Sequence, residues 1–433
     1  MADEKNWIRE AMFYHIYPLG FTGAPLRNEG EATAGGRILE VLDWIEHFKE
    51  LGINAIYFGP IFESVSHGYD TTDYYQTDSR LGSKEDFKKV FTALHENGIR
   101  VIVDGVFNHV GRKFFAFLDV QKNLEQSDYK DWFCNLNFSW QSPLGDSFSY
   151  ENWHGAAELV KLNLRNPAVC EHLLGAVGMW MDELGIDGLR LDAADCVDRE
   201  FFKRLHSFTK GKREDFWLMG EIIHGDYRVW ANDEMFDSVT NYECWKGIYS
   251  SHNDKNYFEI AYSLKRQFGQ GGLYENLCLY NFLDNHDVNR IGSLLKQREN
   301  LKNAYTLLYM MPGIPSIYYG SEWGIEGVKG QGMDADLPLR PKLDLEEMCA
   351  QETDLPAHIR ELAKIRKESD AVKYGAYDEV LVRNKQFVFA RRSGEQYKVI
   401  ALNLTDHAET LHFSYQGKEY EVLLEAYTSK IME

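Results

Sequence analysis

Three short polar motifs in this chain each contain an acidic residue directly after an apolar run. They are Gly-Leu-Arg-Leu-Asp at 188–192, Met-Gly-Glu-Ile at 219–222 and Asp-Asn-His-Asp at 284–287, which contain Asp192, Glu221 and Asp287. A lone acid at a strand end usually serves a turn or a cap. Three such acids in one cleft can hydrolyse a glycosidic bond, because that reaction needs one carboxylate as nucleophile and a second carboxyl group as general acid.

Eight apolar, β-rich runs alternate with helical patterns and would position these acids. The runs span 11–17, 55–58, 100–106, 188–191, 216–219, 235–239, 278–283 and 316–319. Between them, stretches such as 38–51, 84–97, 168–184, 198–209 and 303–311 have apolar residues at three- and four-residue spacing, which is typical of helices. This alternation predicts an α/β fold with parallel strands, and eight units favour a closed (β/α)₈ TIM barrel over an open sheet.

Two regions depart from the alternation. From 110 to about 160 the chain is aromatic and polar with weak periodicity, and it is too long for an ordinary loop. After about residue 373 short alternating runs appear, at 380–383, 387–391, 398–403 and 419–424. We therefore predict a barrel in two parts, 1–109 and 161–372, with a small inserted domain at 110–160 and a C-terminal antiparallel β-sandwich domain at 373–433.

Composition narrows the classes of function. The 433 residues have a formal net charge of −20, which argues against nucleic acid or an anionic membrane surface as partner. Aromatic residues make up 14% of the chain, and aromatic rings suit the apolar faces of sugars. We find no signal peptide and no apolar run that could span a bilayer, and the six scattered cysteines fit reduced thiols. The sequence therefore predicts a soluble cytoplasmic protein, with its oligomeric state left open.

Further polar residues follow the predicted strands. Barrel enzymes place their chemistry at the carboxyl ends of the strands, so residues far apart in sequence meet in one bowl. After the third strand come Asp104, Asn108 and His109, and Arg190 belongs to the fourth. His286 precedes Asp287 after the seventh strand. We expect all of these side chains at one rim.

The motifs resemble those of the α-amylase family, the retaining α-glucan hydrolases and transglycosylases built on a (β/α)₈ barrel. The matching segments are Asp-Gly-Val-Phe-Asn-His (104–109), Gly-Leu-Arg-Leu-Asp (188–192), Gly-Glu-Ile (220–222), Asn-His-Asp (285–287), His-Gly-Tyr-Asp-Thr-Thr-Asp-Tyr (67–74) and Pro-Gly-Ile-Pro-Ser-Ile-Tyr-Tyr-Gly (312–320). The resemblance spans nearly the whole chain.

The resemblance implies a role for each acid. Asp192 is similar to the nucleophile that forms a covalent glycosyl-enzyme, and Glu221 to the general acid/base, whose carboxyl must be protonated when the substrate arrives. Asp287 is similar to the third acid, which holds sugar hydroxyls and helps to distort the ring. Arg190 lies two residues before Asp192, on the same face of the strand, and we expect it to keep the nucleophile ionised.

The resemblance also implies a binding site for one glucose unit. His109 and His286 are expected to donate hydrogen bonds to its hydroxyls, and Tyr69 resembles the stacking platform beneath it. We expect His67 to contact the same region.

Many members of the family bind a structural calcium ion through an Asp and a His that this chain lacks. At those positions stand Lys161, which cannot ligate calcium, and Cys196, a poor ligand for a hard cation. Asn108 alone does not make a site. We therefore expect no metal and no cofactor, with the Lys161 ammonium in the place of the ion.

The segment Lys161-Leu162-Asn163 and the stretches 217–226 and 236–242 are similar to the neopullulanase, cyclomaltodextrinase and maltogenic amylase subfamily. Those enzymes usually carry an extra N-terminal β domain, whereas this chain enters its barrel almost at once. The favoured function is hydrolysis of α-1,4 bonds in maltooligosaccharides, with cyclomaltodextrins and pullulan as related substrates. The alternatives are an α-glucosyl transferase, a sucrose or oligosaccharide phosphorylase, and a non-catalytic carbohydrate-binding relative.

Overall fold

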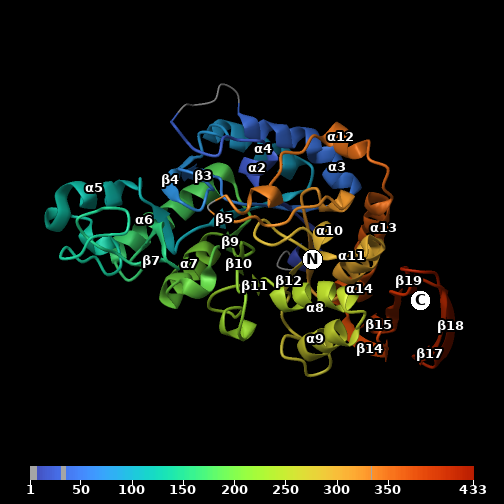
Figure 1. Cartoon of the computed structure of the whole chain (residues 1–433). Coiled ribbons are helices and arrows are strands. Elements are labelled where there is room, and N and C mark those ends of the chain that lie inside the picture. The colour runs from blue at the N-terminus through green and yellow to red at the C-terminus, as the bar shows by residue number, and fades with distance from the viewer. Residues whose placement is uncertain (1–6, 31–35, 333) are drawn as a thin grey trace.

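The computed structural model describes residues 7–30, 36–332 and 334–433. Its centre is an eight-stranded parallel sheet with the strand order β11-β10-β9-β5-β2-β1-β13-β12 (Figure 1). The strands are β1 (Phe13–Ile16), β2 (Ala55–Phe58), β5 (Arg100–Gly105), β9 (Gly188–Leu191), β10 (Trp217–Gly220), β11 (Ser238–Val239), β12 (Tyr280–Phe282) and β13 (Ile314–Tyr318). A parallel bridge between Thr240 and Tyr280 joins the two ends of the sheet. The predicted (β/α)₈ barrel is confirmed.

Helices between the strands surround the barrel. The main ones are α3 (Ile45–Glu50), α4 (Lys84–Glu96), α6 (Pro167–Met179), α7 (Arg199–Lys212), α8 (Tyr242–Asn253), α9 (Phe258–Phe268), α11 (Leu301–Met310) and α13 (Leu355–Glu368). Local sequence sets their ends: Ser83 and Asp86 form a capping box before α4, and Gly52 and Gly98 follow α3 and α4 with φ of 75° and 72°. The helix predicted at 38–51 begins instead as a 3₁₀ helix, η2 (Arg37–Trp44), before α3.

Large side chains fill the interior of the barrel. Phe13, Tyr57, Trp217, Met219 and Tyr280 form one buried cluster with six smaller or neighbouring residues. The larger apolar cluster lies between the strands and the surrounding helices. The barrel is therefore a packed core rather than a channel, and open space for a ligand exists above its strand ends.

A segment between β5 and α6 stands to one side of the barrel (Figure 1). It contains β6 (His109–Gly111), α5 (Phe115–Asn123), β7 (Asn152–Trp153) and β8 (Ala156–Lys161), and its strands pair antiparallel in the order β6-β8-β7. An antiparallel hairpin of β3 (Phe62–Ser64) and β4 (Thr71–Thr77) follows β2. Both insertions leave from carboxyl ends of barrel strands, so they build walls on the side where the acids lie.

The C-terminal strands form an antiparallel β domain at the opposite end of the molecule (Figure 1). One sheet has the order β14-β15-β16-β19 and the other is a hairpin of β17 and β18. Their bounds are Ala376–Val382, Gln386–Ser393, Gln396–Asn403, Glu409–Tyr415, Lys418–Leu424 and Ser429–Met432 for β14 to β19. The sequence runs did not reveal β17 and β19. β19 is half exposed and is defined by its pairing with β16, not by an apolar pattern of its own.

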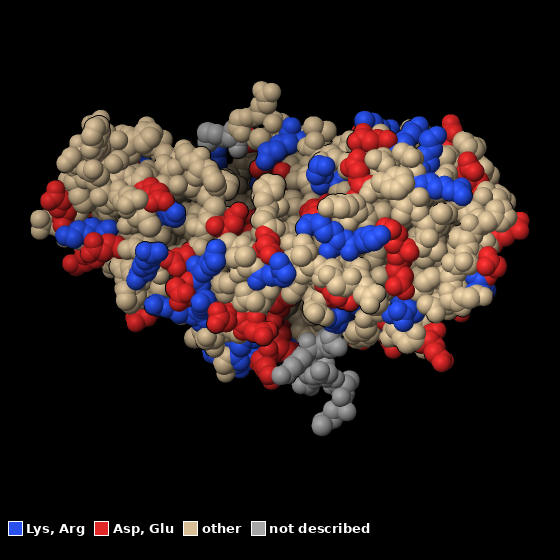
Figure 2. Space-filling model, turned by 90° about the horizontal axis from the view of Figure 1, so that it is seen from below, with Lys and Arg blue, Asp and Glu red and all other residues tan. Residues whose placement is uncertain are grey.

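Three further features concern membrane-spanning segments, cysteines and surface charge. No helix among the described residues is long and apolar enough to cross a membrane. All six cysteines are free thiols, as the sequence predicted. On the face shown in Figure 2, Lys and Arg are interspersed with Asp and Glu, and acidic side chains gather near its lower edge.

Candidate active site

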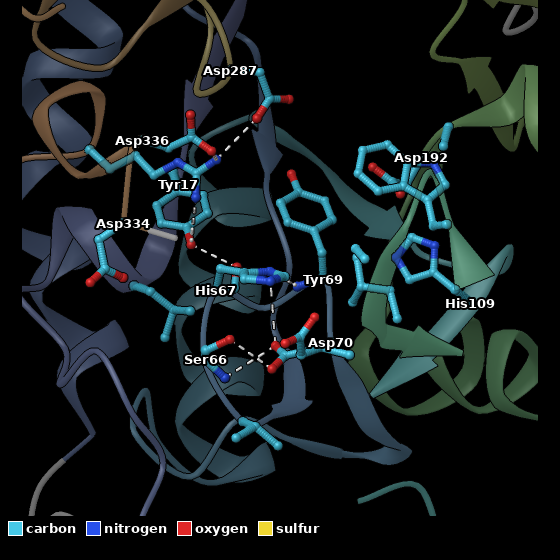
Figure 3. A pocket seen from close by; sticks show the side chains of 18 of the residues that line it. Tyr17, Ser66, His67, Tyr69, Asp70, His109, Asp192, Asp287, Asp334 and Asp336 are labelled. Carbon is cyan, nitrogen blue, oxygen red and sulfur yellow. Dashed lines mark hydrogen bonds and ion pairs between the residues drawn. The ribbon is translucent and has the colours of Figure 1, made fainter. Parts of the chain in front are cut away.

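A pocket of about 1340 Å³ lies at the carboxyl ends of the barrel strands. Its walls include Asp192, Glu221 and Asp287 together with Tyr69 and His109. His67 also lines it. In Figure 3, Tyr69 stands between Asp287 on one side and Asp192 and His109 on the other. Acids separated by almost a hundred residues in sequence are thus brought to one cavity.

Arg190 joins the carboxylates of Asp192 and Glu221, which line this pocket. Its Nη1 donates to Asp192 Oδ1 at 2.8 Å and to both oxygens of Asp104 at 2.9 and 3.0 Å. Its Nη2 lies 2.8 Å from Glu221 Oε2. The side chain of Arg190 is only 4% exposed, so these contacts are shielded from water and their electrostatic attraction is strong. One guanidinium therefore places Asp192 beside Glu221.

The electrostatics of Asp192 differ from the expectation that Arg190 keeps it ionised. Burial raises the pKa of Asp192 well above its ordinary value, and this effect outweighs the lowering by Arg190. The neighbouring carboxylates of Glu221, Asp104 and Asp287 raise the pKa further. Burial and the neighbouring carboxylates therefore favour the protonated form of Asp192.

The turn after Asp192 fixes Glu221. Ala193 has φ 42° and ψ 45°, a left-handed conformation that a residue with a side chain rarely adopts. In this conformation its N–H donates to Glu221 Oε2 at 3.0 Å. On the other side, Tyr242 Oη donates to Glu221 Oε1 at 3.3 Å and accepts from Asn285 Nδ2 at 3.1 Å. The strained turn is thus used to orient a carboxyl group.

Asp287 contacts Arg340 and His286. Its Oδ1 accepts from Arg340 Nη2 at 3.0 Å, and its Oδ2 lies 3.0 Å from His286 Nε2. Burial would raise the pKa of Asp287, but His286, Arg340 and Arg190 outweigh it and hold that pKa well below its usual range. Asp287 is therefore ionised, whereas Asp192 competes for a proton.

Aromatic and imidazole rings line the space between the acids. The ring of His286 stacks between those of Tyr17 and Tyr69, with centroids 5.8 and 5.5 Å away and interplanar angles of 14° and 10°. Tyr69 Oη is hydrogen-bonded to His286 Nε2 and donates to Asp104 Oδ2 at 3.1 Å. His67 is held from behind, since its carbonyl accepts from Tyr17 Oη at 2.7 Å. This stack presents a flat, polar-edged wall.

His109 is poised as a neutral donor. Asn108 Nδ2 donates to His109 Nδ1 at 3.1 Å, which places the ring proton on Nε2. That Nε2 has no hydrogen-bond partner among the described residues. Burial, reinforced by His67, lowers the pKa of His109 to about 3, so the ring carries no charge at neutral pH. A hydroxyl group of a bound ligand would satisfy this nitrogen.

Lys161 lies at the end of β8, next to the pocket wall. Its ammonium bonds Glu151 Oε1 at 2.6 Å. Within the described residues, we find no group of three or more His, Cys, Asp or Glu side chains that could hold a metal ion. Cys196 lines the pocket, and burial raises the pKa of its thiol to about 11.

Sequence reasoning missed several residues of the site. Tyr17 follows β1 directly, so the rule that polar residues at strand ends build the rim could have found it. Arg340 and Asp336 come from the loop after β13, which lacks periodicity, and no sequence signal pointed to them. Tyr242 opens α8, where its hydroxyl reaches Glu221 across the rim.

A (β/α)₈ barrel with three acids, an arginine and stacked aromatic rings at its strand ends defines a class of carbohydrate-active enzymes. The family described as "Alpha amylase, catalytic domain" matches residues 15–361. The chain therefore belongs to the alpha-amylase family and is a glycoside hydrolase, as its motifs predicted.

Proteins with similar sequences or structures support this family assignment. A cyclomaltodextrinase of a Bacillus sp is 31% identical over 94% of this chain and 74% of its own length. The intracellular maltogenic amylase of Bacillus subtilis is 31% identical over 85% of this chain and 63% of its own length. Among solved structures, the cyclic alpha-maltosyl-(1→6)-maltose hydrolase of Arthrobacter globiformis has a TM-score of 0.86 at 26% identity and covers 99% of this chain and 98% of its own.

Proposed function

We propose that this enzyme hydrolyses α-1,4-glucosidic bonds in maltooligosaccharides and cyclomaltodextrins by a retaining double displacement. The observation that carries this proposal is the shared guanidinium of Arg190, which holds Asp192 and Glu221 side by side in the pocket. A nucleophile and an acid that close to each other suit attack and protonation on the same bond.

In the proposed reaction, Asp192 attacks the anomeric carbon while Glu221 gives a proton to the departing glycosidic oxygen. Glu221, then deprotonated, takes a proton from a water molecule, which attacks the glycosyl-enzyme and releases the sugar. Because burial raises the pKa of Asp192, its carboxyl must lose a proton before it attacks. Arg190 then faces the ionised nucleophile.

The remaining residues would bind one glucose unit between the acids. Asp287 is ionised and can hold two sugar hydroxyls while the ring flattens toward the transition state. His109 Nε2 and the imidazole of His286 offer donors, and the ring of Tyr69 offers a stacking face. His67 lines the same wall. This assignment gives each predicted site residue a contact with substrate or with a reacting atom.

A second candidate substrate is a cyclic tetrasaccharide that contains α-1,6 as well as α-1,4 bonds. The structure of the Arthrobacter globiformis hydrolase was also solved with cyclic alpha-maltosyl-(1→6)-maltose, and this chain covers 98% of it. Coverage of the cyclomaltodextrinase relative is 74% of its length. The shared compact architecture therefore favours a test of this substrate beside the cyclomaltodextrins.

We propose that the enzyme works without the calcium ion of many relatives. The ion pair between Lys161 and Glu151 supports this, because an ammonium at that place repels a divalent cation and links the inserted segment internally. We further propose a cytoplasmic location, supported by the six free cysteines and by the relative named as an intracellular maltogenic amylase. Interspersed surface charges support the absence of a nucleic-acid partner.

Product analysis tests the function. The enzyme is incubated with maltoheptaose, β-cyclodextrin, pullulan, sucrose and the cyclic tetrasaccharide, each with and without inorganic phosphate. We expect glucose and maltose from maltoheptaose and β-cyclodextrin, first released as the α-anomer. Glucose 1-phosphate would contradict hydrolysis in favour of a phosphorylase, and long transfer products would favour a transferase. A protein that binds these sugars without turnover would support the non-catalytic alternative.

A further inference from the structure

Tyr57, in the interior of the barrel, reaches the proposed catalytic carboxylates through two intermediate residues, Asp104 and Arg190. It lies on β2 with 2% exposure, and its Oη donates to Asp104 Oδ2 at 2.8 Å. Its ring is stacked on that of His15, with centroids 4.3 Å apart and an interplanar angle of 26°. Tyr57 is absent from the described residues that line the pocket. Its hydroxyl is thus fixed on Asp104 and out of reach of a sugar.

Asp104 is bonded to Arg190 and is absent from the described residues that line the pocket. Its side chain is fully buried, and its two oxygens accept from Arg190 Nη1, from Tyr57 Oη and from Tyr69 Oη. The same Nη1 also donates to Asp192 Oδ1. Asp104 and Asp192 therefore compete for one nitrogen. A hydroxyl that donates a hydrogen bond to Asp104 stabilises its negative charge, which weakens the interaction of Asp104 with Arg190 and strengthens that of Arg190 with Asp192.

We propose that Tyr57 is a positioning residue for the hydrolytic reaction, holding Asp104 so that Arg190 directs its two terminal nitrogens to Asp192 and Glu221. The inference rests on the proposed roles of those two acids. It separates the two aromatic hydroxyls that reach Asp104: Tyr69 belongs to the pocket wall and would touch substrate, whereas Tyr57 acts only through Asp104 and Arg190.

Several charged and titratable groups face Asp192 and Asp104, and a test of Tyr57 must leave all the others in place. Asp192 is faced by Arg190 on β9, Asp104 on β5, Tyr74 on β4, Glu221 after β10 and Asp287 after β12. Asp104 is faced by Arg190, Tyr57 and Tyr69. Removal of the Tyr57 hydroxyl alters this network without deleting a charge or a substrate contact.

The experiment measures kcat and KM for maltoheptaose across pH in wild type and Tyr57→Phe. Without the hydroxyl, Asp104 interacts more strongly with Arg190, and Arg190 interacts less with Asp192. Asp192 then binds its proton more tightly, so the acidic limb of the kcat/KM profile moves to higher pH. We expect a shift of about 0.5 pH unit or more, which lowers kcat about threefold on the acidic side. KM should stay within about twofold, because the contact with substrate is unchanged.

Tyr280→Phe is the matched control. Tyr280 lies on β12 in the same interior cluster, and its Oη bonds Ser316 Oγ at 2.6 Å instead of a carboxylate. This variant loses one buried hydrogen bond of the same kind, so its thermal midpoint should fall like that of Tyr57→Phe while its pH profile stays that of wild type. An acidic limb that is unshifted in Tyr57→Phe, or equally shifted in both variants, overturns the proposal.

A double-mutant cycle with Asp104→Asn decides whether Tyr57 acts through Asp104. Asp104→Asn removes the competing charge and should move the acidic limb to lower pH. On that background Tyr57→Phe should cause no further shift. A shift of the same size with and without the Asp104 carboxylate overturns the proposal. Failure of the proposed function would appear separately, as activity that survives Asp192→Asn.

Discussion

Arg340 Nη2 donates a hydrogen bond to Asp287 Oδ1 at 3.0 Å, although the two residues follow different barrel strands. The Nε of Arg340 donates to the carbonyl of His286 at 3.0 Å, and its guanidinium lies 4.4 Å from the ring centroid of Tyr17. The third acid is therefore oriented by the neighbouring β/α unit as well as by its own loop. This hydrogen bond connects the loop after β12 with the loop after β13.

Loss of this contact should impair turnover. Each charge-assisted hydrogen bond contributes about 1.5–3 kcal/mol, so Arg340→Ala should lower kcat/KM for maltoheptaose about 10- to 100-fold. The control is Asp336→Asn, because Asp336 also accepts from Arg340 Nη2, at 3.1 Å, and its other oxygen pairs with Lys329, which has no part in the proposed reaction. A smaller loss in Arg340→Ala than in Asp336→Asn would contradict the proposed role.

Asp192→Asn should abolish activity while stabilising the fold. We expect kcat to fall about 10⁴-fold or more, as for removal of other catalytic nucleophiles. The pKa of Asp192 is raised by burial, so its contribution to stability is fully present below the unfolded value of about 3.9 and is lost as pH rises through the folded pKa. The thermal midpoint of Asp192→Asn should therefore exceed that of wild type by more at pH 8 than at pH 5.

Glu221→Gln is the comparison for this variant. Its kcat should fall about 10²- to 10⁴-fold for substrates whose leaving group needs a proton. An activated aryl glycoside, which needs no such proton in the first step, should form the glycosyl-enzyme with Glu221→Gln but not with Asp192→Asn. Mass spectrometry of the trapped protein reads this out, and a covalent adduct on Asp192→Asn would refute the assignment.

His109 should make the enzyme lose stability in mild acid. Burial lowers the pKa of His109 to about 3, so the folded state keeps the ring neutral while the unfolded chain takes up a proton below about pH 6.5. Stability therefore falls as pH drops from 6.5 toward the folded pKa, by up to about 1.4 kcal/mol per pH unit. His109→Gln cannot take up this proton, so its chemical-denaturation midpoint should fall less than that of wild type between pH 7 and pH 5.

Calcium should leave the enzyme unchanged. A site with a Kd of about 10⁻⁵ M would add about 2.7 kcal/mol at about 1 mM calcium, which raises a thermal midpoint by several degrees. We expect no such rise, and no loss of activity in a chelator. Lys161→Met should lower the midpoint only slightly, because the Lys161–Glu151 pair is partly exposed. A rise of several degrees with calcium in wild type would contradict the proposal.

The sequence predicted the barrel well because its strands are buried on both faces. Most of the eight strands are rich in apolar residues, and each lies within a few residues of its predicted position. The sixth run was too long: β11 spans only Ser238–Val239, since Asp237 turns its carboxylate to accept from the N–H of Leu218 at 2.8 Å. Such a contact depends on tertiary structure and leaves no periodic pattern.

The residues of the candidate site also fall into those that the sequence predicted and those that it did not. Asp192, Glu221 and Asp287 lie at strand ends, where position alone predicts a shared rim. Arg340 comes from an irregular loop whose path is set by contacts with Tyr17 and His286 rather than by local propensity. The proton balance at Asp192 also escaped prediction, because it depends on how deeply the acid is buried.

β11 and β12 are joined by a single bridge, between Thr240 and Tyr280, whereas every other pair of neighbouring strands in the described barrel has at least two paired residues. We call this contact between β11 and β12 the seam. Local openings should be most frequent there, so amides of 238–241 should exchange with deuterium before those of β5 or β9. The side chains of Tyr242 and Asn285 span the same seam and end on Glu221. Opening of this seam and reorientation of Glu221 would then occur together, and a sugar that holds Glu221 in place should slow exchange along the whole seam.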